Sequence, residues 1–460
     1  MIKEIEILVL GSGCTGLVAA LQAHQTGKKV AILEKMDQIG GNSKRASSGM
    51  NATETVLQLK NNIIDTAQEF YDETFKAGGK MNDPALLQYF TTHTNSAVEW
   101  LKDFNVELGD LTTLGGMNKP RTHRPTDTSP IGAYLVNKLF DAVQKADIPV
   151  YLNSKAVKLT RLSDQRIAVE VENNGEISRI KCNSVILATG GFGASQSLIK
   201  KYAPQYADYK TTNQEGSTGD GLKLAHQFGA QLIQLNQVQI HPTVQQDNPH
   251  VYLIGETVRG EGAILVNTAG KRFINELDTR KKVSNAIIAQ ETKHAYLILD
   301  QQVYRRVKAL GFYESVGLVV KASSLDELAK AIHLPAADFK AEIETWNQAA
   351  TNHYDQQFGR QTGMHPFNEG PFYAIHVAPA VHYTMGGIHI DTQTHVLDEN
   401  GEIIPGLFAA GEVSGGLHGN NRVGGNSIAE TIVFGRQAGI SASQYVNYHG
   451  LKPVAYRWNE

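Results

Sequence analysis

The chain has 460 residues, of which 41% are hydrophobic and 19% charged, and its formal net charge is −3. This length exceeds one compact core and predicts two domains, while the small net charge gives no support for nucleic acid or an anionic membrane as a partner. Only two cysteines, Cys14 and Cys182, are present, which excludes a disulfide framework and a cysteine metal cluster. No apolar run has transmembrane length, and the first predicted strand follows Met1 so closely that we expect no signal peptide and a cytoplasmic location.

The first predicted element is a buried strand. Residues 5–10 read IEILVL, a nearly unbroken apolar run of the kind found in parallel strands. Residues 11–16 then place three glycines in G-x-G-x-x-G register, a helical pattern follows, and a second strand at 29–33 ends on Glu34. This succession of strand, turn, helix, strand and acid predicts a dinucleotide site rather than an ordinary glycine turn.

Each glycine of this turn has its own physical role. Gly11 allows the tight turn, Gly13 lets the backbone approach a pyrophosphate, and Gly16 lets the helix pack close to the strand. The N-terminus of the helix offers unpaired N–H groups to the phosphates. Glu34 would accept hydrogen bonds from ribose hydroxyls.

The next stretch contains loops and helices. Residues 40–51 are small, polar and glycine-rich, and their position after Glu34 favours a loop that offers backbone N–H groups to the cofactor. Helical patterns cover 56–78 and 83–104. The loop-like stretch that follows, 109–130, holds three charged or titratable side chains that we interpret as solvated loop charges, namely Arg121, His123 and Arg124.

The middle of the chain returns to strands. Residues 149–181 alternate apolar and polar positions around a turn at 173–175, which predicts a small antiparallel excursion. A second buried strand at 184–193 ends in small residues suited to close contact with the cofactor. Residues 217–221 open a helix near Asp220.

From about residue 238 the pattern changes, and we interpret residues 238–382 as a second domain. Short predicted strands and helices alternate there with polar islands; the islands lie at 241–243, 255–260 and 278–280, the strands at 263–266 and 295–299, and a solvent-type helix anchored by Trp346 at 336–354. The end of the chain, like the beginning, combines predicted strands with glycine-rich segments. The strands are at 386–390 and 406–412, a glycine- and asparagine-rich loop is at 415–425, and a helix starts at Asn426. The positive end of that helix could point at an electron-rich ring.

Several motifs in one order make the pattern specific. They are GSGCTG with Glu34, GGNSKRASSGMNA, ATGGFG, STGDG, HPT, GETVRGEGAILVN, LDTRKKVS, VHYTMGG and LFAAGEVSGGLHGNNRVGGNSIAETIVFGRQAG. In these motifs, and over essentially its whole length, the chain resembles the soluble flavoprotein fumarate reductases, the family that includes flavocytochrome c. The resemblance implies an α/β fold, with a discontinuous Rossmann-like FAD-binding domain at 1–237 and 383–460, an inserted α+β capping domain at 238–382, and non-covalent FAD.

The same resemblance implies site residues. The catalytic residues would be Arg280, Glu256 and Arg259, and the substrate would be bound by His241, His382, Arg422 and Gly425. The cofactor-binding residues would be Gly11, Gly13, Thr15, Gly16, Glu34, Lys35, Asn42, Ser43, Ser47, Ser48, Gly49, Val157, Thr189, Gly190, Gly191, Asp220, Tyr383, Glu412, Ser427 and Ile428.

These roles follow the chemistry of reducing fumarate to succinate. A hydride leaves reduced flavin N5 for one alkene carbon, a proton reaches the other carbon, and charge developing on a carboxylate is stabilised. By the resemblance, Arg422 and His382 bind one carboxylate and His241 the other, and a guanidinium can do so bidentately. Arg280 would donate the proton although arginine is normally protonated.

Glu256 and Arg259, by the same resemblance, would refill Arg280 with a proton. On residue type and spacing alone, these two residues would be a structural ion pair, Arg280 a surface charge, and His241 a satisfied loop histidine.

One position departs from the family pattern. Its fumarate reductases usually place a threonine, which helps hold a substrate carboxylate, where this chain has Gly255. A hydrogen bond would be lost and space gained, so another 2-enoate such as urocanate or a methacrylate-like acid is an alternative substrate. Thr257 is a possible substitute donor.

Other functions stay open as well. A ketosteroid substrate is disfavoured because both Arg280 and Arg422 are kept; an L-aspartate oxidase-like enzyme and a non-catalytic flavin-bound sensor are the remaining alternatives. Because no second G-x-G-x-x-G unit suggests a nicotinamide site, we expect an external electron donor, either a reduced flavin or a redox partner protein.

Overall fold

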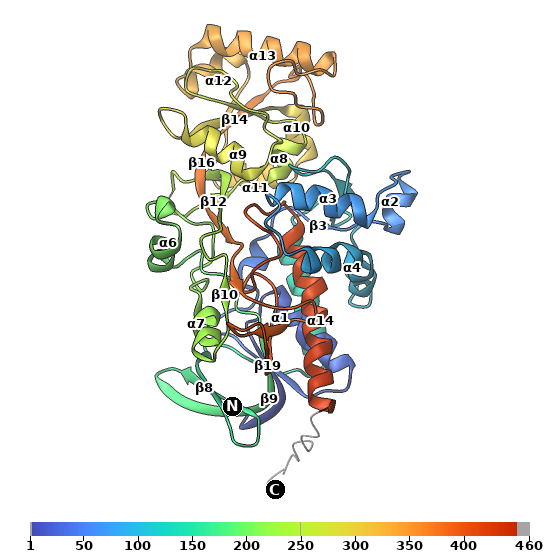
Figure 1. Cartoon of the computed structure of the whole chain (residues 1–460). Helices are drawn as coiled ribbons and strands as arrows, with labels where there is room; N and C mark the ends of the chain where they lie inside the picture. The colour runs from blue at the N-terminus through green and yellow to red at the C-terminus, as the bar shows by residue number, and fades with distance from the viewer. Residues whose placement is uncertain (1, 249, 449–460) are drawn as a thin grey trace.

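The computed structural model of the chain describes residues 2–248 and 250–448. These residues pack around two large hydrophobic cores, one below and one above in Figure 1, and a small third cluster of Leu114, Met117 and Val423. The lower core contains the sheet that begins with the N-terminal strand, and the upper core consists of residues from Ile254 to Val377. The boundaries at 237/238 and 382/383 remain a proposal, and residues 449–460 of the expected FAD-binding domain lie outside the described residues.

The elements before residue 238 are, in chain order, β1 (Glu4–Leu10), α1 (Cys14–Gln25), β2 (Val30–Leu33), η1 (Gly41–Arg45), β3 (Met50–Asn51), α2 (Val56–Lys60), α3 (Ala67–Ala77), α4 (Pro84–Lys102), β4 (Asp110–Thr112), β5 (Thr122–Arg124), α5 (Ile131–Lys145), β6 (Val150–Tyr151), β7 (Lys155–Arg161), β8 (Ile167–Asn173), β9 (Glu176–Leu187), α6 (Gln196–Tyr202), η2 (Pro204–Tyr206), α7 (Asp220–Gln227) and β10 (Leu232–Ile233).

The elements that follow are β11 (Val238–Gln245), β12 (Tyr252–Leu253), α8 (Glu256–Gly260), β13 (Ile264–Val266), α9 (Arg280–Ile288), β14 (Ala295–Asp300), α10 (Gln301–Arg306), α11 (Ala309–Ser315), β15 (Val320–Ala322), α12 (Leu325–Ala331), α13 (Ala336–Thr351), β16 (Phe372–Thr384), β17 (Gly387–Ile388), β18 (His395–Leu397), β19 (Ile403–Ala409) and α14 (Asn426–Tyr448).

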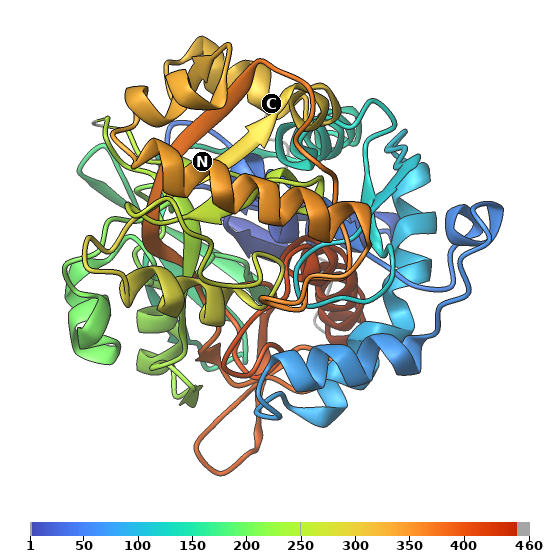
Figure 2. The same cartoon turned by 90° about the horizontal axis from the view of Figure 1, so that it is seen from above.

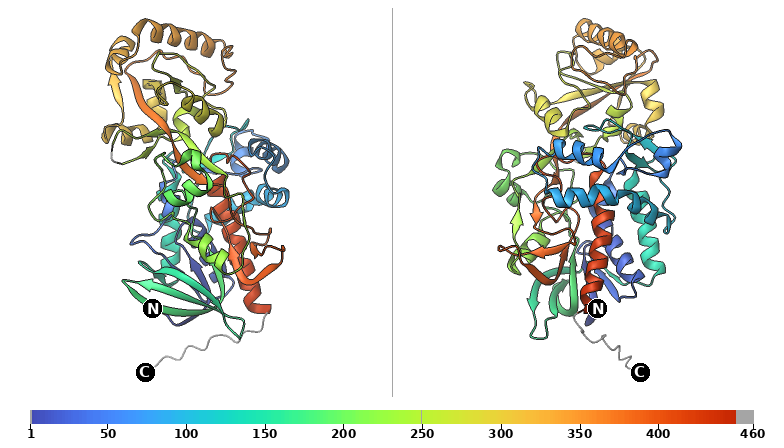
Figure 3. Two further views of the ribbon diagram at one scale, coloured as in Figure 1. Left: turned by 60° about the vertical axis from the view of Figure 1, so that its left-hand side comes forward. Right: turned by 45° about the vertical axis from the view of Figure 1, so that its right-hand side comes forward.

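The larger sheet has the order β18-β19-β9-β1-β2-β6, with β7 and β8 beside β9. Its central strands are parallel: Leu10 of β1 lies opposite both Leu33 of β2 and Leu187 of β9. Because parallel strands end at the same edge, the glycine turn, Glu34 and the small residues after β9 come together there. Helices α1 and α14 pack against each other, and α14 runs the height of the lower part in Figure 3. The expected Rossmann-like α/β fold is therefore confirmed.

The antiparallel excursion is a hairpin attached to this sheet. Strands β7, β8 and β9 pair antiparallel, and the β8–β9 turn places Asn173 opposite Glu176. The two turn residues, Asn174 and Gly175, have φ angles of 50° and 83°. Positive φ at both positions is the requirement of the tight type I′ hairpin turn, which is why Asn-Gly predicted it correctly.

The second sheet is antiparallel, with the order β12-β11-β16-β14-β13 and β15 beside β16. Helices α12 and α13 lie over it at the top of Figure 1, and Figure 2 looks down on α13 from above. Trp346 of α13 is fully buried, so the helix is anchored as expected. Strand β16 leads from this sheet back toward the larger one (Figure 1), and its last residues therefore reach the region between the two cores.

Two sequence-based predictions in the N-terminal half are wrong. The helix expected over 56–78 is two helices, each started by a threonine side chain that accepts a backbone N–H bond, Thr55 for α2 and Thr66 for α3. The side chains of Arg121, His123 and Arg124 are buried rather than solvated.

Arg121 shows why the loop charges are buried. Its guanidinium binds Asp65 at 2.7 Å and Glu73 at 2.5 Å, and its side chain is fully buried. His123 is fully buried, and Arg124 binds Asp110 at 2.6 Å. Long-range partners that a local pattern does not reveal thus turn a predicted surface loop into part of the interior.

The strand expected over 406–412 is β19 at Ile403–Ala409, whereas the other C-terminal strand is shorter than expected. The strand predicted over 386–390 is only β17, which pairs with β10. Among the described residues, the structure contains no helix whose length and apolar character would let it cross a membrane.

Candidate active site

One large pocket joins the glycine turn to the polar islands of the second part of the chain. Its lining runs from Gly11 and Glu34 to Arg280, His382 and Arg422. It encloses about 1540 Å³ of space outside protein atoms, part of it open to solvent. Because the lining extends from the dinucleotide-type glycine turn to the side chains of Arg280 and Arg422, the pocket suits a cofactor together with a small anionic substrate.

The glycine turn has the close contacts that its pattern predicts. Gly11 has φ 107°, and a Cβ atom there would lie 2.3 Å from the carbonyl oxygen of Ala188. A Cβ on Gly16 would lie 1.9 Å from the carbonyl oxygen of Gly11, whereas Gly13 has no atom nearer than 3.7 Å. Gly11 and Gly16 thus permit tight packing, and Gly13 leaves the N-terminus of α1 open toward the pocket.

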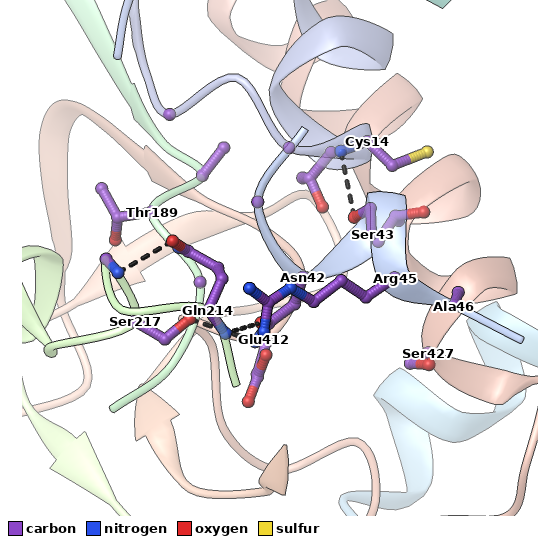
Figure 4. Close-up of a pocket in the computed structure, with 18 of the residues that line it drawn as sticks. Cys14, Asn42, Ser43, Arg45, Ala46, Thr189, Gln214, Ser217, Glu412 and Ser427 are labelled. Atoms are coloured by element: carbon purple, nitrogen blue, oxygen red, sulfur yellow. Dashed lines mark hydrogen bonds between the residues drawn. The ribbon is translucent and has the colours of Figure 1, made fainter. Parts of the chain in front are cut away.

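Polar side chains at the same edge complete this cradle. Glu34 accepts hydrogen bonds from the Ser12 amide at 3.0 Å and the Ser12 hydroxyl at 2.6 Å, so its carboxylate is held at the end of β2. Ser43 accepts a bond from the Cys14 amide at 3.1 Å, as the dashed line in Figure 4 shows. Asn42 and Glu412 line the pocket nearby (Figure 4). Such a row of donors and a fixed carboxylate fits a dinucleotide.

Most of the predicted site residues line this single pocket. They are Gly11, Gly13, Thr15, Glu34, Lys35, Asn42, Ser43, Ser47, Ser48, Gly49, Thr189, Gly190, Asp220, Arg280, His382, Tyr383, Glu412, Arg422, Gly425, Ser427 and Ile428. The remaining six, Gly16, Val157, Gly191, His241, Glu256 and Arg259, lie behind or beside the lining; Val157, for example, follows the lining residue Ala156.

Arg280 is held by a carboxylate from the neighbouring helix. Its Nε and Nη2 donate to the two oxygens of Glu256 at 2.7 and 3.0 Å, and Arg259 Nη2 lies 3.5 Å from the same carboxylate. Burial opposes ionisation of Glu256, but the charges of Arg280 and Arg259 outweigh it and lower its pKa to about 2. Burial lowers the pKa of Arg259 to about 10. The three side chains thus form a buried, charged chain with Arg280 at the pocket.

Arg422 and two histidines are far from the glycine turn in sequence. In the structure they lie close to Arg280. Arg422 stacks over the Tyr383 ring, with 4.3 Å between its Cζ and the ring centroid. The rings of His241 and His382, on the paired strands β11 and β16, have centroids 5.1 Å apart. Burial, followed by the charge of Arg280, lowers the pKa of both histidines well below the ordinary value, so both are neutral at physiological pH.

The unpaired polar atoms of this group point to an anion. The Thr243 amide donates to His241 Nδ1 at 3.3 Å, which leaves the proton of the neutral ring on Nε2. Nε2 of His241 and Nε of Arg422 are buried and have no hydrogen-bond partner in the described structure. Two unpaired donors beside buried guanidinium groups are costly unless a ligand accepts from them.

Two contacts at this site were not predicted from the sequence. Gln239 of β11 accepts from Arg280 Nη1 at 3.1 Å and donates to the Arg422 carbonyl at 2.8 Å, so it joins the two arginines. A Cβ on Gly424 would lie 2.0 Å from Glu256 Oε2, so only glycine fits there. The sequence signal that could have revealed Gln239 was its location, two residues before His241 in a strand.

The expected gain of space at Gly255 is wrong. A Cβ atom at this position would lie 2.9 Å from the hydroxyl of Ser47 and 3.3 Å from its Cβ. Ser47 therefore takes most of the room that a side chain at 255 would use. Position 255 therefore offers little extra room for a bulkier substrate.

Glu412 gives the pocket a pH-dependent group. Burial raises its pKa to about 7, although the Thr384 amide bonds to its carboxylate at 3.0 Å. Because the folded state keeps a proton that the unfolded chain loses near pH 4.5, the stability that Glu412 contributes should fall as pH rises from about 4.5 to 7, by at most about 3 kcal/mol. The buried neutral histidines act in the opposite direction, so denaturation of the flavin-free protein at pH 5 and pH 8 is compared with that of Glu412→Gln. The stability of the wild type relative to the variant should fall at the higher pH, and an unchanged difference between the two proteins would contradict the assignment.

Comparison with known proteins gives a consistent result. A family model described as FAD binding domain matches residues 6–428. The NADH:fumarate oxidoreductase of Klebsiella pneumoniae (strain 342) is 44% identical over 444 residues, which are 96% of this chain and 48% of that protein. A fumarate reductase (cytochrome) of Shewanella frigidimarina is 39% identical over 447 residues, which are 96% of this chain and 77% of that protein.

A solved structure agrees with the sequence relatives. The open conformation of a flavocytochrome c3 fumarate reductase superposes with a TM-score of 0.80 at 37% identity, over 96% of this chain and 79% of that one. The chain thus spans about half of the Klebsiella relative and about three quarters of the Shewanella relative.

Proposed function

Because this chain belongs to the FAD-binding-domain family and, within it, to the flavoprotein fumarate reductases, we propose that it reduces fumarate to succinate. The observation that carries the proposal is a single pocket lined both by a dinucleotide cradle and by Arg280 and Arg422. FAD is the cofactor of the family, and we propose that it binds without a covalent link. When bound and reduced, FAD supplies the hydride.

The cofactor cradle has a part for each region of a dinucleotide. The open N-terminus of α1 at Gly13 would bind the pyrophosphate, and Glu34 would accept from the ribose hydroxyls. At the opposite end, Ser427 and Ile428 lie in the first turn of α14. The positive end of that helix would stabilise negative charge that develops on a ring placed against it.

The charge of the substrate end favours a dicarboxylate. Arg259, Arg280 and Arg422 are buried, and of the residues described in direct contact with them at this end, Glu256 supplies one carboxylate. The positive charge of Arg280 and Arg422 at the pocket favours a negatively charged substrate such as the fumarate dianion. Arg422 and His382 would bind one carboxylate, and the unpaired Nε2–H of His241 would donate to the other.

Proton supply would run through the buried charged chain. Arg280 would give its proton to the alkene carbon next to the one that accepts the hydride. The ionised carboxylate of Glu256, 2.7 Å from Arg280, would relay to it a proton taken from Arg259, which lies 3.5 Å from the same carboxylate. The bidentate geometry holds the Arg280 guanidinium in one orientation, which is what a positioned proton donor requires.

Three further points of the proposal concern the context of the site. An external donor, a reduced flavin or a redox partner protein, would reduce the FAD. Residues 238–382 would act as a capping domain that closes over the substrate. A cytoplasmic location stays a prediction, and cell fractionation would check it.

Anaerobic stopped-flow spectroscopy tests the substrate directly. Protein with photoreduced FAD is mixed in turn with fumarate, urocanate, methacrylate and buffer, and the return of the absorbance of oxidised flavin is followed. We expect fumarate to reoxidise the flavin fastest and succinate to be the product. Faster reoxidation by urocanate or methacrylate would replace the proposed substrate, and no reoxidation by any acid would leave a flavin-bound sensor.

A further inference from the structure

The contact between Ser47 and Gly255 has no role in the proposed mechanism. Ser47 belongs to the glycine-rich loop after η1, and Gly255 immediately precedes Glu256, the partner of Arg280. A Cβ at 255 would lie 2.9 Å from the Ser47 hydroxyl. The loop that borders the cofactor cradle thus places the Ser47 hydroxyl next to the start of α8, at the substrate end of the pocket.

The hydroxyl of Ser47 is free to bind a ligand. Ser47 lines the same pocket as Arg280, His382 and Arg422, and its hydroxyl has no hydrogen-bond partner among the described residues. The other hydroxyl near Gly255 is engaged: Tyr313 accepts from the Gly255 amide at 3.2 Å and donates to the Leu253 carbonyl at 3.1 Å. Of these two hydroxyls, only that of Ser47 can donate into the pocket.

The segment around Gly255 also leads to His241. The Ile254 amide donates to the Thr243 carbonyl at 3.0 Å, and the Thr243 hydroxyl donates to the Ile254 carbonyl at 2.9 Å. The Thr243 amide in turn fixes the ring of His241 at 3.3 Å. The segment around Gly255, which the Ser47 hydroxyl approaches, is thus bonded through Thr243 to the ring of His241.

We propose that Ser47 determines specificity for a dicarboxylate, by donating its hydroxyl hydrogen bond to the carboxylate that His241 also binds. The inference rests on the proposed function and assigns Ser47 to the substrate rather than to the cofactor. A neutral donor is sufficient here because the buried guanidinium groups already supply the charge. Gly255 and Ser47 act as a pair, because the absence of a side chain at 255 leaves space for the Ser47 hydroxyl.

The test compares two acids on the FAD-loaded protein. Removing a hydrogen bond to a charged group costs about 1.5–3 kcal/mol, so Ser47→Ala should lower kcat/KM for fumarate about tenfold to a hundredfold, chiefly through KM. Acrylate, a 2-enoate with one carboxylate, lacks the group that Ser47 would bind and should lose less than about threefold. Malonate, a dicarboxylate without an alkene, should bind Ser47→Ala about tenfold more weakly in a titration of flavin absorbance.

Neighbouring variants make the result specific. Ser48→Ala changes the next serine of the same loop, and any effect should be equal for both acids. Gly255→Thr alone should have low fumarate activity, because its threonine side chain would clash with Ser47. Ser47→Ala combined with Gly255→Thr should recover much of the fumarate activity. Equal losses for fumarate and acrylate in Ser47→Ala, or weaker FAD retention with unchanged malonate binding, would overturn the role of Ser47. Failure of the wild-type protein to reduce fumarate would instead reject the proposed function.

Discussion

Replacing Arg280 with alanine should lower fumarate turnover by about a thousandfold, within the 10²–10⁴-fold range for loss of a general acid, while FAD remains bound. Arg280 is the first residue of α9, and the glycine turn and Glu34 belong to other elements that line the pocket. Its removal should leave the cradle intact. Steady-state turnover with an artificial reductant, together with the flavin absorbance spectrum, measures both effects.

Arg280→Lys separates charge from geometry. Lysine keeps a positive charge but cannot bind Glu256 through two parallel N–H groups, as Arg280 does at 2.7 and 3.0 Å. We expect most of the activity to be lost in this variant too. Lys282→Ala, on the same helix with a 67% exposed side chain, is the matched control and should keep normal turnover. Near-normal fumarate reduction by Arg280→Ala would refute the proton-donor role.

The parts of the fold that could be predicted from the sequence are those with local causes. The parallel strands, Gly11, Gly16 and the Asn174-Gly175 turn are specified by neighbours in the chain or by their own φ angles. Arg121 could not be placed because its partners, Asp65 and Glu73, come from a distant segment. A charged residue in a loop pattern is surface-exposed unless the fold supplies such partners.

The candidate site shows the same division. The resemblance named the polar side chains that meet in the pocket, but it gave no means to see which residues support them. Gln239 joins Arg280 to Arg422, and Gly424 makes room for Glu256. At Gly255 the sequence indicated free space, whereas the structure fills that space from the loop carrying Ser47. Contacts between segments far apart in sequence decide each of these cases.

A buried ion cluster behind α8 connects this site to the stability of the upper core. Glu276 is fully buried and accepts bonds from Arg272 Nε at 2.8 Å and Arg360 Nη1 at 3.1 Å. Arg272 also binds Asp355 at 3.0 Å. The Glu276 carbonyl accepts from Arg259 Nη1 at 2.6 Å, so the cluster also fixes the arginine next to Glu256.

Replacing Glu276 with glutamine should destabilise the protein by about 3–5 kcal/mol, because the variant leaves the buried guanidinium groups without their carboxylate. Hydrogen exchange of amides in β13 and β14, which belong to this core, should report the loss even if the larger core unfolds separately. Asp338→Asn is the matched control, since Asp338 pairs with Lys271 at the surface at 3.2 Å and such exposed pairs contribute about 0–1 kcal/mol. An equally small effect of Glu276→Gln would mean that Asp355 and the carbonyl groups around Arg360 suffice to hold the cluster. If Glu276→Gln loses much stability and also turns over fumarate more slowly, the orientation of Arg259 depends on this buried carboxylate.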